Sequence, residues 1–427
     1  MGAGEGDHGG YGRAEGDVGM ILHTLPQGWT WSTLTEIASP NKNAIVDGPF
    51  GSSLKTSDYR PNGVPVLQGK NITNSQFEWK EIRYISEEKA DELKRSQVRI
   101  GDLLMIKIGS IGYSAYLDDL NGHDFAVIPA NMAKISFDTK KVNKRYAWHW
   151  LNNPPSVRKL NSLSSKTAQS ALNLTKIKTF PIPLPPLTEQ KRIAAILDKA
   201  DAIRRKRQAA IKLADDFLRA TFLDMFGDPV TNPRGWPWGT LGDFIHSAKD
   251  GPHISPQYST NGIPFLSTRH IRPGKIIWED LKYISREEAK RQWLKCKPEK
   301  GDILYTKGGT TGIAAVFDSD QEIAVWVHVS LLKTNHKKAE PVWLESMLNT
   351  AYCYSQSQRF THGITNQDLG LTRMVNIKTY SPPLELQKMF SRIVAKVKYT
   401  MANHRRQKEQ ASNLFNSLAQ RAFRGEL

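Results

Sequence analysis

The chain carries one ordered series of short motifs twice. The tetrapeptide GWTW at residues 28–31 returns as GWPW at 235–238, and DGP at 47–49 returns at 250–252. Five more pairs follow in the same order: GVPVL (63–67) and GIPFL (262–266), YIS (84–86) and YIS (283–285), GDLL (101–104) and GDIL (301–304), KIGSIG (107–112) and KGGTTG (307–312), PLTEQK (186–191) and PLELQK (383–388). The members of each pair lie 197 to 207 residues apart, about half of the 427-residue chain. Solenoid repeats recur every roughly 20–50 residues, so this spacing predicts a two-fold duplication of one large unit.

The first part of each half mixes short apolar runs with turn residues over about 160 residues. Apolar runs predict strands at 64–67, 103–106 and 303–305. Helices are predicted at 86–93 and 285–293, where a serine precedes acidic residues, and also at 146–151 and 341–348. Trp29, Trp31, Trp236 and Trp238 are predicted to anchor the core at the start of each domain. The fold class expected from this mixture is α+β, with two duplicated mixed α/β domains.

The second part of each half is predicted to be one long helix. Between Leu187 and Phe226 there is no proline or glycine, and apolar residues recur at steps of three and four. Forty helical residues would form a rod of roughly 60 Å. The second copy runs from Leu384 to about Phe423. An amphipathic rod of this length cannot bury its apolar stripe alone, so the two helices are expected to pair as a coiled coil. Two separate surface helices are the alternative.

Charge and cysteine content narrow the class of protein. Lys and Arg total 59 against 42 for Asp and Glu, a net charge of +17 that favours a polyanionic partner. A merely soluble basic protein is the alternative.

Two cysteines, Cys296 and Cys353, are too few for a disulfide framework or a Cys-based zinc site, and they fit a reducing cytoplasm. No run of about 20 apolar residues is present, so we predict no membrane span.

These motifs together resemble one family, the specificity (S) subunits of type I restriction–modification systems. The resemblance rests on the duplicated GVP and GDLL blocks and on PIPLPP at 181–186, which leads into QKRI at 190–193. The helix exits, MFGDP at 225–229 and AFRGEL at 422–427, are also similar to those of the family. Each block alone is weak evidence. Their repetition in order, over nearly all of residues 25–427, makes the resemblance specific.

The resemblance implies a non-catalytic DNA-recognition subunit. Each mixed domain would be a target recognition domain that reads one half of a bipartite duplex site. The long helices would form an antiparallel spacer and dock two methyltransferase (M) subunits, which carry S-adenosylmethionine and methylate adenine N6. Two restriction (R) subunits, using ATP and Mg, would complete the nuclease, and the chain itself would bind no cofactor or metal. The domains expected are a disordered leader (1–24), recognition domain 1 (25–185), a central long helix (186–228), recognition domain 2 (229–382) and a C-terminal long helix (383–427).

Polar residues in the predicted loops are candidates for DNA contact. Asn, Gln, Arg and Lys read purine edges in the major groove, and Lys, Arg, Ser, Thr and backbone N–H groups bind phosphates. Solvated turns are the alternative. In the first half the candidates are Ser52, Ser53, Lys55, Gln68, Lys70, Asn71, Lys107, Ser110, Lys166, Thr167 and Gln169. In the second half they are Thr268, Arg269, His270, Lys307, Thr310, Thr311, His362, Thr365 and Asn366.

Arginines in the middle of both long helices form a further group. Contact with the DNA spacer or with an M subunit is one interpretation, and a solvated helix face is the other. The residues are Arg204, Arg205, Arg207, Arg405 and Arg406.

Three rival functions remain open. A self-sufficient methyltransferase or nuclease would need catalytic motifs, and the sequence NPPS at 153–156 is similar to an adenine-methyltransferase motif. That motif needs an aromatic residue to stack on the flipped base, which Ser156 cannot provide, so we expect a loop there. The second rival is an orphan S subunit that serves modification only. The third is a coiled-coil assembly protein without a DNA role.

Overall fold

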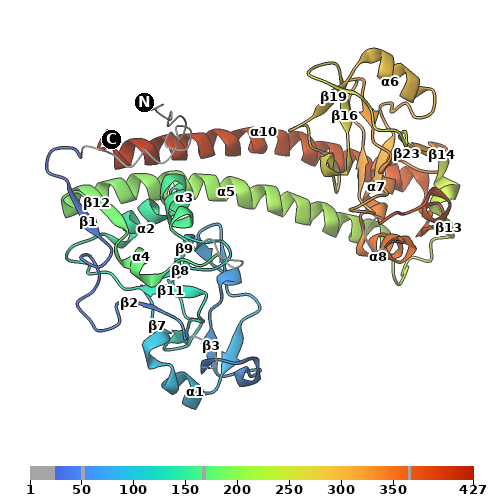
Figure 1. Ribbon diagram of the computed structural model, residues 1–427. Helices are drawn as coiled ribbons and strands as arrows, with labels where there is room; N and C mark the ends of the chain where they lie inside the picture. Colours follow the sequence, from blue (N-terminus) through green and yellow to red (C-terminus); the bar gives the residue numbers. More distant parts are fainter. Residues whose placement is uncertain (1–24, 50–52, 166–169, 364–366) are drawn as a thin grey trace, which may run out of the picture. The chain divides into compact units, whose positions relative to one another are not determined.

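The computed structural model describes residues 25–49, 53–165, 170–363 and 367–427, and the predicted leader lies outside them (Figure 1). The chain divides into two compact units. The first unit combines the chain up to Arg207 with Gln407–Leu427, and the second is Gln208–Arg406. Each unit therefore contains one mixed α/β domain and a part of both long helices.

The first unit is built on two four-stranded sheets. One has the strand order β2-β11-β8-β9 and is antiparallel, and the other has the order β6-β3-β10-β7, with β3 and β10 parallel. Its strands are β1 (Thr30–Thr33), β2 (Ile45–Asp47), β3 (Val64–Val66), β4 (Ile72–Thr73), β5 (Gln76–Phe77), β6 (Arg83–Ile85), β7 (Gln97–Val98), β8 (Leu103–Ile106), β9 (Ser114–Tyr116), β10 (Ala126–Val127), β11 (Met132–Ile135) and β12 (Pro181–Leu184). Its helices are α1 (Glu87–Glu92), α2 (Lys144–Asn152), α3 (Pro154–Ser162), α4 (Leu174–Lys178) and the start of α5 (Leu187–Phe226), with short 3₁₀ turns η2 (Thr56–Asp58), η3 (Gly69–Asn71) and η4 (Lys94–Ser96).

The second unit repeats this arrangement. Its sheets have the orders β14-β23-β20-β21 and β15-β19-β16-β22, with β16 and β22 parallel. Its strands are β13 (Trp238–Thr240), β14 (Ile245–Asp250), β15 (Tyr258–Ser259), β16 (Ile263–Leu266), β17 (Ile271–Arg272), β18 (Lys275–Ile276), β19 (Lys282–Ile284), β20 (Ile303–Thr306), β21 (Ala314–Val316), β22 (Ala324–Val325), β23 (Val329–Thr334) and β24 (Lys378–Tyr380). Its helices are α6 (Arg286–Trp293), α7 (Pro341–Leu348), α8 (Ala351–Phe360), α9 (Leu371–Met374) and the start of α10 (Leu384–Phe423), with η5 (Leu241–Phe244) and η6 (Thr268–His270). The shared topology confirms the duplication and the α+β class.

Local sequence explains where the short helices begin. Ser86 caps α1 by accepting a hydrogen bond from the backbone N–H of Lys89, and Ser285 caps α6 in the same way. Asn153 is a cap as well, because its side chain accepts from the backbone N–H of Ser156 at 3.1 Å. Pro154 then occupies the first turn of α3, a position that needs no N–H donor. The loop expected at 153–156 was therefore wrong: the segment starts a helix.

One buried glutamine ties each long helix to its own domain. Gln190 Oε1 accepts from the backbone N–H of Asn143 at 2.8 Å, and its Nε2 donates to the carbonyl of Pro185 at 2.8 Å. Gln387 makes the same contacts with Glu340 and Pro382, at 2.9 and 2.8 Å. Both side chains are buried. This duplicated contact fixes the direction in which each helix leaves its domain.

Each unit pairs the two long helices in antiparallel fashion. In the first unit the end of α10 lies against the start of α5: Arg192 donates to the carbonyl of Leu427 at 2.8 Å, and Phe423 shares a core cluster with Ile193. In the second unit the end of α5 meets the start of α10, where Phe226 and Phe390 pack at 5.5 Å. The predicted pairing of the helices is confirmed.

The paired tryptophans at the start of each unit separate into two roles. Trp29 and Trp236 pack against the main core of their units. Trp31 and Trp238 are 38% and 51% exposed, so the expectation that they anchor the core was wrong. Both lie on the first strand of their unit, which pairs with only one other strand, β12 or β24. Among the described residues, no helix is both long and apolar enough to cross a membrane.

Candidate DNA interface

The lysine that opens each glycine-containing loop is buried in an ion pair. Lys107 follows β8, and its Nζ lies 2.7 Å from Asp47 Oδ2, with both side chains 5% exposed. In the second unit, Lys307 Nζ lies 3.4 Å from Asp250 and 2.9 Å from Asp368. Both lysines were predicted to bind DNA. They instead neutralise the aspartate of the duplicated DGP motif, so we remove them from the interface.

A second cation reaches the same aspartate in each unit. Arg95 lies 3.3 Å from Asp47, and Lys295 lies 2.5 Å from Asp250. Burial acts to raise the pKa of Asp250, but Lys295 and Lys307 outweigh it and hold that pKa below its ordinary value. The carboxylate therefore stays charged inside the protein. The glycine after it is required by close packing, because a Cβ on Gly251 would meet the carbonyl oxygen of Val325 at 2.1 Å.

The turn after β3 and its counterpart after β16 are each held by a buried side chain. Asn71 Oδ1 accepts from the backbone N–H of Gln68 at 2.8 Å, and its Nδ2 donates to the carbonyl of Lys80 at 2.7 Å. His270 Nδ1 accepts from the backbone N–H of Ser267 at 2.9 Å, and burial lowers the pKa of this histidine. Asn71 and His270 were predicted to contact DNA. Their polar groups are occupied inside the turn, so both are removed from the interface.

The same two turns expose a cation at the same repeat position. Lys70 is exposed and pairs with Glu81 at 2.8 Å, and Arg269 is exposed and donates to the carbonyl of Asp280. Gln68 and Thr268, also in these turns, are half-buried. A surface ion pair such as that of Lys70 contributes little to stability, so the cation remains available to a phosphate.

The tips of the glycine-containing loops are exposed. Ser110 and Thr310 present their hydroxyls there, each beside a glycine with positive φ, 92° at Gly109 and 67° at Gly309. Thr311 was also predicted to contact DNA, but it is 2% exposed and its hydroxyl lies 2.9 Å from that of Thr361. We remove it from the interface for that reason.

The remaining loop candidates divide by what the structure describes. Ser53, Lys55 and His362 are exposed. The others lie outside the described residues and stay predictions from the sequence: Ser52, Lys166, Thr167, Gln169, Thr365 and Asn366.

Two polar residues that the sequence did not indicate lie beside the loops. The carbonyl of Asn131 accepts the backbone N–H of Lys107, and the carbonyl of His328 accepts that of Lys307, both at 2.8 Å. In the part of the chain that the structure describes, Asn131 is half-buried and its Oδ1 is buried without a hydrogen-bond partner, whereas His328 is exposed. A Cβ on Gly69 would lie 3.6 Å from Asn131 Nδ2, so this asparagine borders both candidate turns of the first unit. The sequences that flank Asn131 and His328 differ in length and content, so the sequence alone does not show that the two residues are equivalent.

A tyrosine with a cation over its ring also occurs once in each unit. The guanidinium carbon of Arg83 lies 5.0 Å from the ring centroid of Tyr59, and Lys282 Nζ lies 4.1 Å from that of Tyr258. Both pairs keep the 199-residue spacing of the repeat. Arg83 and Lys282 are exposed at the sheet that carries the first candidate turn. They are further candidates for phosphate contact.

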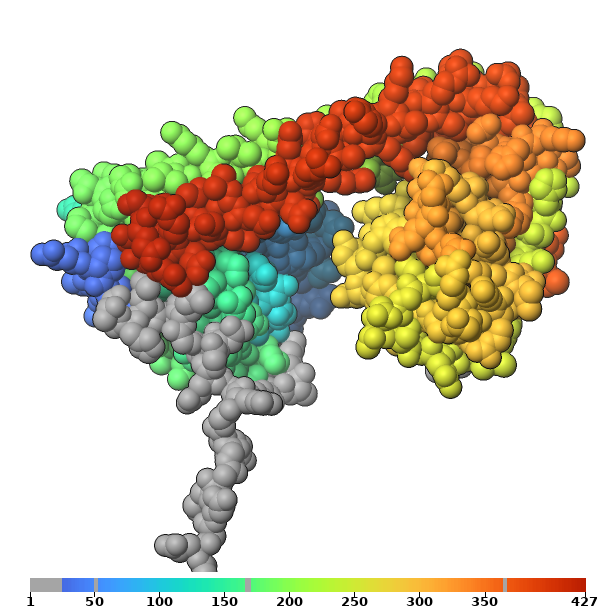
Figure 2. Space-filling view, turned by 90° about the horizontal axis from the view of Figure 1, so that it is seen from above, coloured from blue at the N-terminus to red at the C-terminus, as the bar shows by residue number. Residues whose placement is uncertain are grey.

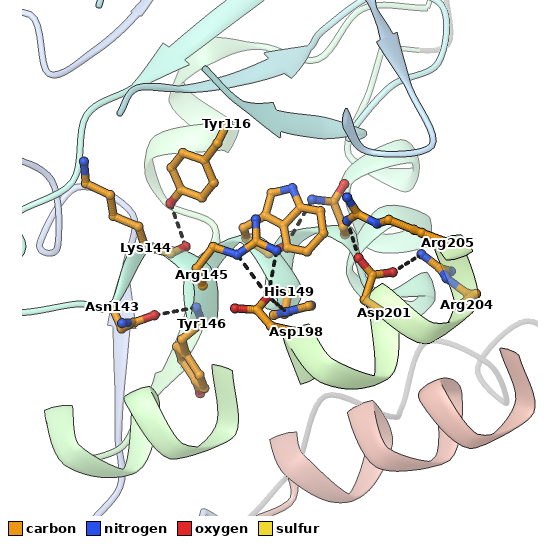
Figure 3. A network of polar contacts seen from close by, with 12 residues as sticks. Tyr116, Asn143, Lys144, Arg145, Tyr146, His149, Asp198, Asp201, Arg204 and Arg205 are labelled. Atoms are coloured by element: carbon orange, nitrogen blue, oxygen red, sulfur yellow. Dashed lines mark hydrogen bonds and ion pairs between the residues drawn. The ribbon is translucent and has the colours of Figure 1, made fainter. Parts of the chain in front are cut away.

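The arginines of α5 serve the first unit itself. Arg204 lies 2.5 Å from Asp201, and Arg205 pairs with the same carboxylate, which is 2% exposed (Figure 3). Arg204 also covers the ring of Phe415 at 4.8 Å. The alternative of a fully solvated helix face was therefore wrong for these two, whereas their contact with the DNA spacer or an M subunit stays a prediction. Arg207 is half-buried, and Arg405 and Arg406 are exposed.

The described residues offer neither a metal-binding cluster nor a reactive thiol. They contain no group of three or more His, Cys, Asp or Glu placed to hold a metal ion. Both cysteines are buried, and burial raises the pKa of Cys296 and of Cys353 to about 12. A thiol with so high a pKa is a poor nucleophile at neutral pH.

Comparison with known proteins assigns the family. Residues 26–213 and 233–413 match the type I restriction modification DNA specificity domain. The EcoBI specificity subunit of Escherichia coli is 25% identical over 334 residues, which cover 71% of this chain and 69% of that protein. The putative MjaX specificity subunit of Methanocaldococcus jannaschii is 21% identical over 416 residues, 90% of each chain. Both names confirm the expected specificity subunit, as opposed to a methyltransferase or nuclease subunit.

A solved structure shares the fold. The crystal structure of a type I restriction–modification S subunit from M. genitalium superposes with a TM-score of 0.56 at 13% identity, covering 95% of this chain and 98% of that one. Two copies of the family domain thus correspond to the two halves of the internal repeat. The chain belongs to the family of type I restriction–modification DNA specificity subunits.

Proposed function

We propose that each unit reads one half of a bipartite duplex DNA site. The supporting observation is that the two units share a buried frame and differ in the polar groups exposed on it. The frame includes the Lys107–Asp47 pair and its counterpart Lys307–Asp250. At matching exposed or half-exposed positions the chemistry changes, as from Asn131 to His328. Two readers of different half-sites require such a combination.

The proposed interface contains the exposed candidates and the residues added by the structure. Side chains that differ between the units, such as Gln68 and Asn131 against Ser267 and His328, would contact bases. Cations kept in both units would contact phosphates, which position the protein without reading sequence. The full described set is Ser53, Lys55, Gln68, Lys70, Arg83, Ser110 and Asn131 in the first unit and Ser267, Thr268, Arg269, Lys282, Thr310, His328 and His362 in the second.

The long helices would set the spacer and dock two M subunits. Phe217 on α5 and Leu414 on α10 occupy the same repeat position and are 51% and 55% exposed. Side chains of α10 (red) lie at the surface in Figure 2. The same apolar feature on two equivalent helices suits two copies of one partner. S-adenosylmethionine would then be bound by the M subunits, and ATP and Mg by R subunits, in the cytoplasm.

Methylome sequencing tests the proposal. A host that co-expresses this chain with its M subunit should show methyladenine in a split motif. Asn131→Ala should relax the first half of the motif alone, and His328→Ala the second half alone, so each variant is the control of the other. Loss of specificity in both halves with either variant would overturn the assignment of one half-site to each unit.

A binding assay separates the rival functions. Duplex DNA should bind the purified complex with an affinity that falls steeply with salt, because phosphate contacts release counterions. Methylation without cleavage in a host that also supplies R subunits would indicate an orphan subunit that serves modification only. A complex that binds no duplex DNA at low salt would favour the coiled-coil assembly protein and contradict the proposal.

A further inference from the structure

Three exposed histidines surround the buried Lys307 of the second unit. The carbonyl of His328 accepts the backbone N–H of this lysine at 2.8 Å. His253 Nε2 lies 3.4 Å from Asp250, one of the two carboxylates that pair with the lysine. The backbone of His362 forms a β-bridge with the residue that carries the other carboxylate. All three histidines are exposed, so they gather around one buried ion pair at the base of a loop of the candidate DNA interface.

Two of the histidines have neutral residues at the matched positions of the first unit. Asn131 matches His328, since the carbonyl of each accepts the backbone N–H of the buried lysine at 2.8 Å. Ser165 matches His362, since the backbone N–H of each donates at 3.0 Å to a carbonyl six residues later. Neither an asparagine nor a serine side chain can take up a positive charge.

The third histidine matches a neutral residue through the DGP motif. In the sequence His253 follows the aspartate of this motif by three residues, as Phe50 does in the first copy. Imidazole is the side chain that ordinarily changes its charge between pH 5 and 8. At these three positions, therefore, only the second unit can change its charge in that range. The charged groups around the three histidines are Asp250, Lys295, Lys307, Asp368 and Arg373.

The ring of His328 occupies room that an absent side chain provides. A Cβ on Gly308 would lie 2.0 Å from His328 Nδ1. The φ of Gly308 is not positive, so its backbone conformation does not require a glycine. The first unit has Ile108 at this place, because both residues form the same β-bridge across the loop. Histidine and glycine thus occur together in one unit, and asparagine and isoleucine in the other, which indicates that packing against the loop positions this imidazole.

A DNA backbone that approaches this face would favour the charged form of the imidazoles. A nearby opposite charge stabilises a protonated ring, and that ring can donate hydrogen bonds from both nitrogens to phosphate oxygens. His270, in the other candidate turn of the second unit, does not join them, because its burial lowers its pKa and its Nδ1 accepts a hydrogen bond inside the turn.

We propose that the second unit holds the phosphates of its half-site with protonated His253, His328 and His362, so that DNA binding by this unit takes up protons. The proposal rests on the proposed function, because it requires this face to contact DNA. The first unit would bind its own half-site without proton uptake at the matched positions. The second half-site would therefore be held more tightly as the pH falls from 8 to 6, while the grip on the first would change less.

The pH dependence of DNA affinity, measured at constant ionic strength, tests this proposal. The full chain is used in complex with its M subunit, and the probe is a duplex that carries the split motif found by methylome sequencing. The affinity should rise about tenfold or more from pH 8 to pH 6, because one proton taken up changes it by up to about tenfold per pH unit. The natural complex should lose this rise on a duplex whose second half-site is scrambled, and keep it when the first is scrambled.

Neutral replacements of the histidines separate their effect from that of the M subunits. H253Q/H328N/H362S keeps polar groups at the three positions and should bind with little dependence on pH. H336Q is the control, because it removes an exposed histidine at the other end of β23, and it should behave like the natural chain. If the triple variant keeps the full pH dependence, the proposal is wrong and DNA recognition stands. A complex that binds no duplex at any pH would overturn the proposed function as well.

A gain of function in the first unit gives a second, independent test. I108G/N131H builds the histidine and its glycine into the first unit, so binding to the first half-site should become more pH-dependent. N131H alone is the matched control and should gain less, because the side chain of Ile108 occupies the place of the ring. Equal gains for N131H and I108G/N131H would show that the role given to Gly308 is wrong, and no gain in either would count against proton uptake by a histidine at this position.

Discussion

The two units neutralise their buried lysine with different numbers of carboxylates. Lys107 pairs with Asp47, whereas Lys307 pairs with both Asp250 and Asp368. Asp368 lies on the strand segment that bridges to Gly308, and the first unit has Ala171 at that place. The comparison teaches that duplication preserved the buried lysine and its aspartate, while the rim around them was free to change. Buried residues that match between the copies therefore indicate the frame, and exposed residues that differ around them indicate the reading surface.

Removing the lysines is the strongest way to break this comparison. Lys107→Met should cost about 3 kcal/mol of the free energy of unfolding, because it leaves a buried carboxylate with only its more exposed second cation. Lys307→Met should cost a similar amount, since Asp250 keeps Lys295. Chemical denaturation measures both losses, with Lys70→Met as the exposed control. A loss below about 1 kcal/mol in either unit would show that the lysine is not part of the frame.

The helix-anchoring glutamines test whether the frame is equivalent in both units. Gln190→Leu and Gln387→Leu each leave a backbone N–H and a carbonyl without their partner, so each should cost about 2 kcal/mol. The two losses should agree closely, because the contact distances are nearly identical. Unequal losses, measured by the same denaturation, would mean that one unit relies on its glutamine more than the other.

The exposed cations test the shared part of the reading surface. Lys70→Ala and Arg269→Ala should each weaken binding to duplex DNA about tenfold, the effect of one charge-assisted hydrogen bond. The loss should be the same for all target sequences, and the salt dependence should fall by about one phosphate contact. Filter binding over a salt series gives both quantities. A variant that instead changes sequence preference would identify its cation as a base reader.

The pH dependence of stability is the smallest expected difference between the two units. Burial alone would raise the pKa of Asp198, but the hydrogen bonds from His149 and Arg145 outweigh it and lower the pKa from 3.8 to about 2. The contribution of Asp198 to stability is therefore complete above pH 3.8 and disappears as the pH falls toward 2. Burial raises the pKa of Glu345 above 4.5, so stability in the second unit falls as the pH rises through that raised pKa. The melting temperature of the natural chain should therefore approach that of Asp198→Asn from above as the pH falls toward 2. It should lie below that of Glu345→Gln at higher pH and approach it as the pH falls. Parallel pH profiles for natural and variant chains would contradict both assignments.

Much of the fold follows from local patterns in the sequence. The long helices were predictable because forty residues without proline or glycine carry a single period, and α1 and α6 because Ser86 and Ser285 precede acids. The buried lysines were not predictable, since a lysine in a glycine-containing loop is usually exposed. Lys107 is buried only because Asp47, 60 residues earlier, lies behind it. Its role depends on tertiary contacts, as does that of Asn131.

The composition of the first unit has a consequence for biosynthesis. Its core includes Tyr146 and Trp150, and both rings are closed by Phe423, which belongs to Gln407–Leu427. A ribosome therefore releases recognition domain 1 some two hundred residues before the chain segment that covers its aromatic face exists. During that interval the aromatic face of the nascent domain stays exposed. A nonsense codon late in the message would therefore destabilise the domain that is synthesised first.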